Sequence, residues 1–232
     1  MKKLQTTAIV AALLCGTSFG AQARDTAEQI RDVPSFKEVR LNGSMDVEIT
    51  VGGSQSVKVI ADDKIIDNIE TEVRGDELRI GLESGHYSHI KVMRVVITMP
   101  EITGADIHGS GDMTVKGAKA DRFELELKGS GDAMFSGAKF GDLDIELQGS
   151  GDIEIDGTCM SIDIELQGSG DVDAGDMECE NAKVSLRGSG DVEVFASISA
   201  DIGVHGSGDV VVRGEPDKLN SRVRGSGDIT IR

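Results

Sequence analysis

Gly109-Ser-Gly-Asp112 is the first of seven copies of one tetrapeptide that recur along this chain at nearly constant spacing. Successive copies are 18 to 20 residues apart, and they begin at Gly109, Gly129, Gly149, Gly168, Gly188, Gly206 and Gly225. A turn sequence that returns at a nearly fixed period is typical of a solenoid, in which each repeat buries its apolar face against its neighbours.

Apolar and polar residues alternate on both sides of each tetrapeptide. Around the third copy, Ile145 and Leu147 precede it and Ile153 and Ile155 follow it, with a glutamate between the members of each pair. Since strand side chains alternate between two faces, each repeat supplies two short strands with apolar inner faces. No helical pattern recurs between the strands, which excludes repeated βαβ units. The predicted fold class is all-β: a single-stranded, right-handed parallel β-helix with coils of about 19–20 residues and Gly-Ser-Gly-Asp corners.

The first half of the chain has a looser pattern of strands. Leu41-Asn-Gly-Ser-Met-Asp-Val-Glu-Ile49 nevertheless matches Leu147-Gln-Gly-Ser-Gly-Asp-Ile-Glu-Ile155 at most positions. Gly52-Gly53 and Gly75-Asp76 are turn signals between other strand candidates. We therefore expect one domain over residues 24–232, with irregular opening coils in 33–108 and regular coils in 109–232.

The N-terminus has the pattern of a secretory signal peptide. Lys2 and Lys3 precede an apolar run from Ala8 to Leu14, and Ala21-Gln22-Ala23 is a small-x-small cleavage pattern. The apolar run is shorter than the roughly 20 residues that a spanning helix needs. We expect residues 1–23 to be cleaved and the product to be an exported bacterial protein, periplasmic or secreted, without a membrane span.

The net charge of the chain narrows the classes of partner that it can bind. The formal net charge is −17 at pH 7. An excess of negative charge this large disfavours nucleic acid and anionic membrane surfaces as partners. It is compatible with solubility or with cation binding.

The seven tetrapeptides place one aspartate in each corner, so the fold stacks these carboxylates in a column. The column consists of Asp112, Asp132, Asp152, Asp171, Asp191, Asp209 and Asp228. Two carboxylates one coil apart repel by about 1 kcal/mol in water, and by more at a lower effective dielectric constant.

The aspartate column has two interpretations. In the structural interpretation, each aspartate accepts backbone N–H bonds in its own corner while the glycines supply positive φ angles. In the alternative, Ca²⁺ lies between successive carboxylates and turn carbonyls, because hard cations take six to eight oxygen ligands. The first interpretation explains the glycines and the aspartates together, and it implies no cofactor.

Two cysteines remain after removal of the signal peptide. Cys159 and Cys179 each lie nine residues before the next corner glycine, so they occupy equivalent positions on adjacent coils. Stacked Cα atoms roughly 4.8 Å apart fall within disulfide range, and an exported protein meets an oxidising compartment. We predict a disulfide; the alternative is two buried thiols that act as small hydrophobes.

The order of these features resembles a known family. Phe36-Lys-Glu-Val-Arg-Leu-Asn-Gly-Ser-Met-Asp-Val-Glu-Ile49, then Val95-Val-Ile-Thr-Met-Pro100, then repeated Gly-Ser-Gly-Asp, is similar to the head GIN domain of bacterial proteins labelled auto-transporter adhesins. The likeness covers residues 33–232. It implies a right-handed β-helix and an adhesin-like role, and it carries no catalytic or binding residues.

Two functions follow from these observations. The first is a non-enzymatic, surface-presenting or adhesin-like interaction module, whose ligand is a cell-surface, polysaccharide or protein partner. The alternative is a carbohydrate-active β-helix, either polysaccharide-binding or a lyase or hydrolase, with its site in the variable arc opposite the corners: 157–161, 175–181 and 214–220. No catalytic motif is present, so we expect no enzyme. The last strand leaves an edge through which copies could assemble as a homo-oligomer.

Overall fold

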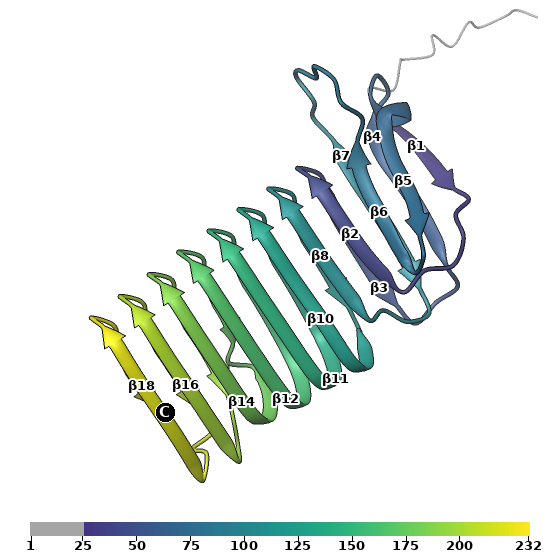
Figure 1. Ribbon diagram of the computed structural model, residues 1–232. Helices are drawn as coiled ribbons and strands as arrows, with labels where there is room; N and C mark the ends of the chain where they lie inside the picture. Colours follow the sequence, from purple (N-terminus) through teal and green to yellow (C-terminus); the bar gives the residue numbers. More distant parts are fainter. Residues whose placement is uncertain (1–25) are drawn as a thin grey trace, which may run out of the picture.

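The chain winds into a right-handed β-solenoid of about six turns (Figure 1). The computed structural model describes residues 26–232, and that part holds 19 strands and one short 3-10 helix. The predicted signal peptide lies outside the described residues. Within 26–232, no helix is long and apolar enough to cross a membrane. The predicted fold class is confirmed.

One wall of the solenoid consists of the strands that lead into the corners. Adjacent strands of this wall pair in parallel. Corresponding residues of successive coils are in register, for example Leu127 with Leu147 and Leu147 with Leu166. In stacking order, these strands are β6 (Glu77–Leu82), β2 (Glu38–Gly43), β8 (Gly104–Gly109), β10 (Lys119–Gly129), β11 (Ala133–Gly149), β12 (Ile153–Gly168), β14 (Met177–Gly188), β16 (Ser199–Gly206) and β18 (Lys218–Gly225).

The opposite wall consists of the strands that leave the corners. The first parts of β11 and β12 belong to it, because both strands continue around the solenoid into the first wall. The other members, also in parallel, are β7 (Met93–Met99), β3 (Asp46–Val51), β9 (Met113–Lys116), β13 (Val172–Ala174), β15 (Val192–Phe195), β17 (Val210–Arg213) and β19 (Ile229–Ile231). In the described residues, β18 and β19 each pair on one side. Self-association through this edge stays a prediction.

The opening part of the chain is not a simple series of coils. β2 and β3 do form a coil, but it lies between β6–β7 on one side and β8–β9 on the other. β1 (Thr26–Arg31) and β4 (Ser56–Asp62) are antiparallel to each other, and β5 (Ile69–Arg74), which follows the short helix η1 (Ile66–Asn68), is antiparallel to β6. Gly75-Asp76 explains the reversal, because it joins β5 to β6 by a two-residue hairpin in which Gly75 has φ 65°. The expectation of opening coils throughout 33–108 therefore holds for β2 and β3 but not for β4 and β5, which help to cap the end of the solenoid (Figure 1).

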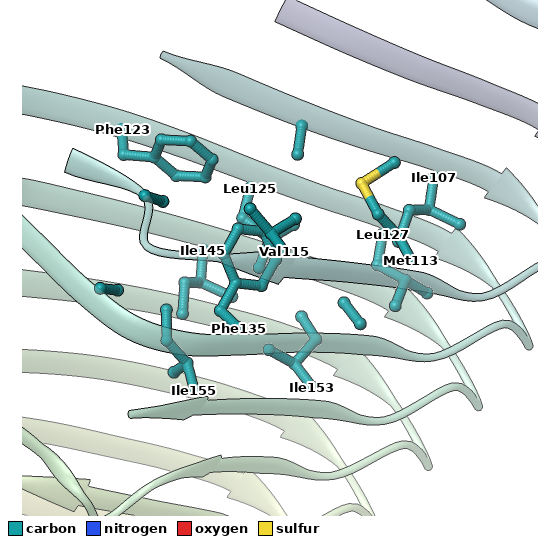
Figure 2. Packing of buried hydrophobic residues seen from close by; sticks show 14 of the residues in the cluster. Ile107, Met113, Val115, Phe123, Leu125, Leu127, Phe135, Ile145, Ile153 and Ile155 are labelled. Carbon is teal, nitrogen blue, oxygen red and sulfur yellow. The ribbon is translucent and has the colours of Figure 1, made fainter. Parts of the chain in front are cut away.

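The core is a set of continuous aliphatic columns between the two walls. Leu127, Leu147 and Leu166 are fully buried, and residues such as Ile153 and Ile155 face them from the other wall (Figure 2). Three phenylalanines pack together in this core: Phe123 stacks on Phe140 at 4.6 Å between ring centroids and meets Phe135 edge-on at 5.5 Å. Burial of aromatic and aliphatic side chains is the main source of stability in such a fold.

The corners stack so closely that their glycines are required. A Cβ atom on the third corner residue would lie about 2 Å from a backbone oxygen of the preceding coil, for example 2.0 Å from Gly151 O if placed on Gly170. The first corner glycine has a positive φ, 146° at Gly168, and would make a similar clash. Met45 takes the third position in the first corner, where it is buried, and Gly111 of the next coil packs against its backbone. The requirement for glycine therefore comes from the preceding coil and not from the turn alone.

We predict that Gly170→Ala lowers the free energy of unfolding by about 3 kcal/mol or more, since the methyl group overlaps rigid backbone. Gly43→Ala is the matched control, because Gly43 has φ 126° but no atom within 4 Å of an added Cβ. Backbone strain alone costs about 1–2 kcal/mol there. Denaturant unfolding of both variants measures the difference. Equal losses at the two positions would show that stacking does not dictate the glycines.

Candidate functional site

The seven corner aspartates form a hydrogen-bonded ladder. Asp132 N donates to Asp112 Oδ1 at 3.0 Å, and the same bond joins each successive pair up to Asp228 N and Asp209 Oδ1 at 2.8 Å. Each carboxylate from Asp112 to Asp209 thus accepts an N–H from the next coil. The expectation that the bonds lie within the same corner is wrong, because the corner N–H groups point along the solenoid axis toward the neighbouring corner.

This ladder offsets the repulsion between stacked carboxylates. Hydrogen bonds to a charged acceptor are stronger than those between neutral groups. Backbone bonds reinforce the contact: Ser130 N donates to Gly109 O at 2.8 Å, and Met113 N donates to Asp132 O at 2.8 Å. The aspartates therefore connect coils, which is a structural use of a polar side chain.

Calcium between the aspartates stays a prediction. One oxygen of every carboxylate from Asp112 to Asp209 already accepts an N–H. Among residues 26–232, no group of three or more His, Cys, Asp or Glu side chains is placed to hold a metal ion together. Titration of metal-free protein with Ca²⁺ would test the prediction.

The two cysteines meet across adjacent coils. Cys159 and Cys179 are register partners in β12 and β14, their Cα atoms are 4.5 Å apart, and their sulfur atoms are joined. Both side chains are buried, and Cys179 is 2% exposed. The bond therefore fastens two neighbouring coils at the arc opposite the corners.

An acidic column runs along the outer face of the first wall, from Asp106 through Glu126 and Glu146 to Glu165. Lys128 forms an ion pair with Glu126, and Gln148 donates to Glu146. At the capped end, Arg40 Nη2 contacts Asp106 Oδ2 at 2.6 Å. Burial, together with the nearby Asp106 carboxylate, raises the pKa of Glu38 above its ordinary value. Along this column, Arg40 and Lys128 are therefore held by carboxylates.

A groove of about 820 Å³ opens on the same wall, toward the arc. We call it the polar groove. Two columns of outward side chains line it, each running along the solenoid axis in register. The first column is Arg122, Asp142, Ser161, Asn181, Ser199 and Lys218. The second column is Asp144, Asp163, Lys183, Asp201 and Asn220.

Hydrogen bonds between coils fix the small polar side chains of the polar groove. Ser161 Oγ donates to Asp142 Oδ1 at 2.5 Å, and Ser199 Oγ donates to Asn181 Oδ1 at 2.7 Å. Asn220 Nδ2 donates to Asp201 Oδ1 at 2.9 Å. These contacts hold donors and acceptors in place before any ligand arrives, which lowers the entropy cost of binding.

Ion pairs neutralise two of the bases in the polar groove. Arg122 Nη2 lies 2.7 Å from Asp144 Oδ2, and Lys183 Nζ lies 2.6 Å from Asp163 Oδ2. The hydrogen bond that Lys183 donates to Asp163 raises the pKa of Lys183 above its ordinary value. Lys183 therefore stays protonated at neutral pH, and two of the three bases that line the groove are paired with carboxylates within the protein.

The sequence located the arc but not these side chains. Ser161, Asn181 and Lys218 lie in or beside the three arc segments that the carbohydrate hypothesis singled out. Asn181 and Ser199 are 18 residues apart and have no shared motif, so only the strand register brings them together. The corner aspartates are not among the residues that line the groove.

The fold and the groove define a β-solenoid with an elongated polar surface. The chain belongs to the family described as "Putative auto-transporter adhesin, head GIN domain", whose model matches residues 35–216. The predicted resemblance is confirmed. Membership implies an adhesin-like protein that is exported or at the cell surface.

Solved structures share the fold. A putative adhesin from Bacteroides fragilis is 22% identical, with a TM-score of 0.86 over 90% of this chain and 98% of that one. A putative lipid binding protein from Parabacteroides distasonis is 23% identical, with a TM-score of 0.74 over 90% and 97%. A putative adhesin from the same organism is 20% identical, with a TM-score of 0.67 over 89% and 97%. Among curated proteins, none matches this chain.

We predict that Asp152→Ala lowers the free energy of unfolding by about 1.5–3 kcal/mol, because Asp171 N loses a charged acceptor. Asp152→Asn keeps an acceptor oxygen and removes one charge from the column, so it should be close to wild type. Asp46→Ala is the matched control: among the described residues, no hydrogen bond to the Asp46 carboxylate is present in the first corner. Thermal and denaturant unfolding compare the three. A loss at Asp46 as large as that at Asp152 would contradict a stabilising ladder.

We predict that Cys159→Ser/Cys179→Ser lowers the free energy of unfolding by about 2–4 kcal/mol, through the larger conformational freedom of the unfolded chain. Mass spectrometry of the alkylated, unreduced protein verifies the bond in the wild type. Denaturant unfolding in the presence and absence of reductant gives the loss, and the double variant should not respond to reductant. A wild type that alkylates at both cysteines without reduction would refute the bond.

Proposed function

We propose that the protein is an exported, non-enzymatic interaction module that presents the polar groove to a ligand outside the cell, in the manner of an adhesin. This proposal rests on the length of the polar groove and on the hydrogen bonds that fix its side chains. It extends across six strands from β10 to β18, and its small polar side chains are held by one another. A long, preorganised and regular surface suits recognition of an extended partner.

The chemistry of the groove supports binding over catalysis. A catalytic nucleophile, acid or base must be free to reach the substrate. Here Asp144 is paired with Arg122 and Asp163 with Lys183, while Asp142 accepts from Ser161. The residues that line the groove include neither histidine nor cysteine.

A carbohydrate-active enzyme is the second candidate. The polar groove lies at the arc where that hypothesis placed a site, and Asp144 and Asp163 are register partners on adjacent coils. Pairs of carboxylates are the usual groups in glycoside hydrolysis. Release of reducing ends from a polysaccharide by the wild type would favour this candidate.

The comparisons support an adhesin-like role more than lipid binding. The family description and two of the structural neighbours refer to adhesins. One neighbour from Parabacteroides distasonis is described instead as a lipid binding protein. Sites for apolar ligands are lined mainly by apolar side chains, whereas both columns of the polar groove consist of polar and charged residues.

We predict that beads coated with the protein attach to epithelial cells, and that Asn181→Ala/Ser199→Ala reduces attachment about tenfold, the effect of losing one or two net hydrogen bonds. Gln148→Ala/Gln167→Ala is the matched control. These two residues are also uncharged register partners on adjacent coils of the same wall, but they do not line the groove. Bead counts under flow give the result.

Two outcomes would contradict the proposal. Equal attachment by the groove variant and the control would show that the groove is not the binding surface. Turnover of a polysaccharide that the groove variant abolishes would make the protein an enzyme.

A further inference from the structure

We infer that the ligand of the polar groove is a linear, electrically neutral polysaccharide that lies along the solenoid axis. This inference rests on the proposed function and names its ligand class. It follows from three properties of the groove: its direction, its hydrogen-bonding groups and its charge.

The direction of the groove matches a polymer. Its first column takes one outward residue from each of six successive coils. At a strand spacing of about 4.8 Å, this column spans about 24 Å. The groove therefore offers the same kind of contact repeatedly along one line, which suits a chain built of repeating units.

The hydrogen-bonding groups match hydroxyl groups. A sugar hydroxyl both donates and accepts, so it needs partners of both kinds close together. Ser199 and Asn181 form a fixed hydroxyl–amide pair between β16 and β14, and Asn220 and Asp201 form an amide–carboxylate pair between β18 and β16. Each pair keeps unused lone pairs or N–H groups for a ligand. Leu219 lines the same groove and is 45% exposed, so it adds an apolar contact for the C–H face of a sugar ring.

The charge of the groove disfavours polyanions. Arg122 and Lys183, two of the three bases that line the groove, are already paired with carboxylates, so they are not free to bind uronate, sulfate or phosphate groups. The acidic column from Asp106 to Glu165 lies on the same wall and repels anionic chains. The lining holds five aspartates (Asp142, Asp144, Asp163, Asp201 and Asp217) and three bases (Arg122, Lys183 and Lys218), so the groove has a net negative charge that disfavours an anionic chain.

The residues that line the groove include no aromatic side chain, which makes the affinity for a polysaccharide depend on its length. Stacking of rings on Trp or Tyr is not available among the residues that line it. Binding therefore depends on many hydrogen bonds of small net value, so a long chain is held much better than a short oligosaccharide.

The experiment measures binding of the purified protein to neutral and anionic polysaccharides by affinity electrophoresis and calorimetry. The neutral probes are a glucan, a mannan and a galactan; the anionic probes are polygalacturonate and heparin. We expect one or more neutral polymers to bind, and Asn181→Ala/Ser199→Ala to weaken that binding about tenfold. Gln148→Ala/Gln167→Ala should bind as the wild type does. The expected order of affinity is neutral polymer, then its short oligosaccharide, with no binding of anionic polymers.

Failure of this inference is distinguishable from failure of the proposed function. Groove-dependent attachment of beads without binding of any neutral polymer would overturn the ligand class and leave the interaction module in place. Preference for an anionic polymer would also overturn the ligand class. Loss of groove dependence in both assays would overturn both proposals.

Discussion

The fold depends on how closely each corner approaches the corner before it. At the third corner position, a Cβ atom would lie about 2 Å from a backbone oxygen of the preceding coil, so only glycine fits. That approach brings Ser N–H to Gly C=O and Asp N–H to the aspartate carboxylate at hydrogen-bonding distance. Met45 occupies the third position of the first corner, and Gly111 of the second corner packs on the Met45 backbone. It is therefore the later corner of each stacked pair that needs a glycine. The tetrapeptide is therefore an interface between coils as much as a turn.

Much of this architecture was predictable from local patterns, and the order of the opening strands was not. Alternation around Ile145 and Ile153 defines which side chains face inward, and both are buried. Alternation does not say which strand pairs with which. β2 and β3 precede β6 and β7 in the chain, yet they lie closer to the regular coils. Since all these strands have similar apolar faces, their stacking order depends on hairpins such as Gly75-Asp76, whose effect on the whole fold the sequence does not reveal.

The candidate site was predictable only in outline. The aspartate column was visible at once because it repeats, but the direction of its hydrogen bonds required the geometry of stacked corners. The polar groove was visible only as an arc of variable sequence. Asn181 and Ser199 face each other because β14 and β16 are in register, and register depends on coil lengths that vary between 18 and 20 residues. A difference of one residue would place a different pair side by side.

In this chain, the residues that stabilise the solenoid repeat from coil to coil, whereas the residues that line the polar groove vary. Where every coil must meet the same steric and hydrogen-bonding demands, the same residues return, as at the corners. The first column of the polar groove has no such demand: it changes from Arg122 to Asp142, Ser161 and Asn181 over adjacent coils. These positions point outward from paired strands, so their side chains are free to differ without a loss of coil pairing. Residues can be adapted to a ligand only at positions that the pairing and stacking of coils do not constrain. The irregular columns are therefore better evidence of function than the aspartates that dominate the sequence.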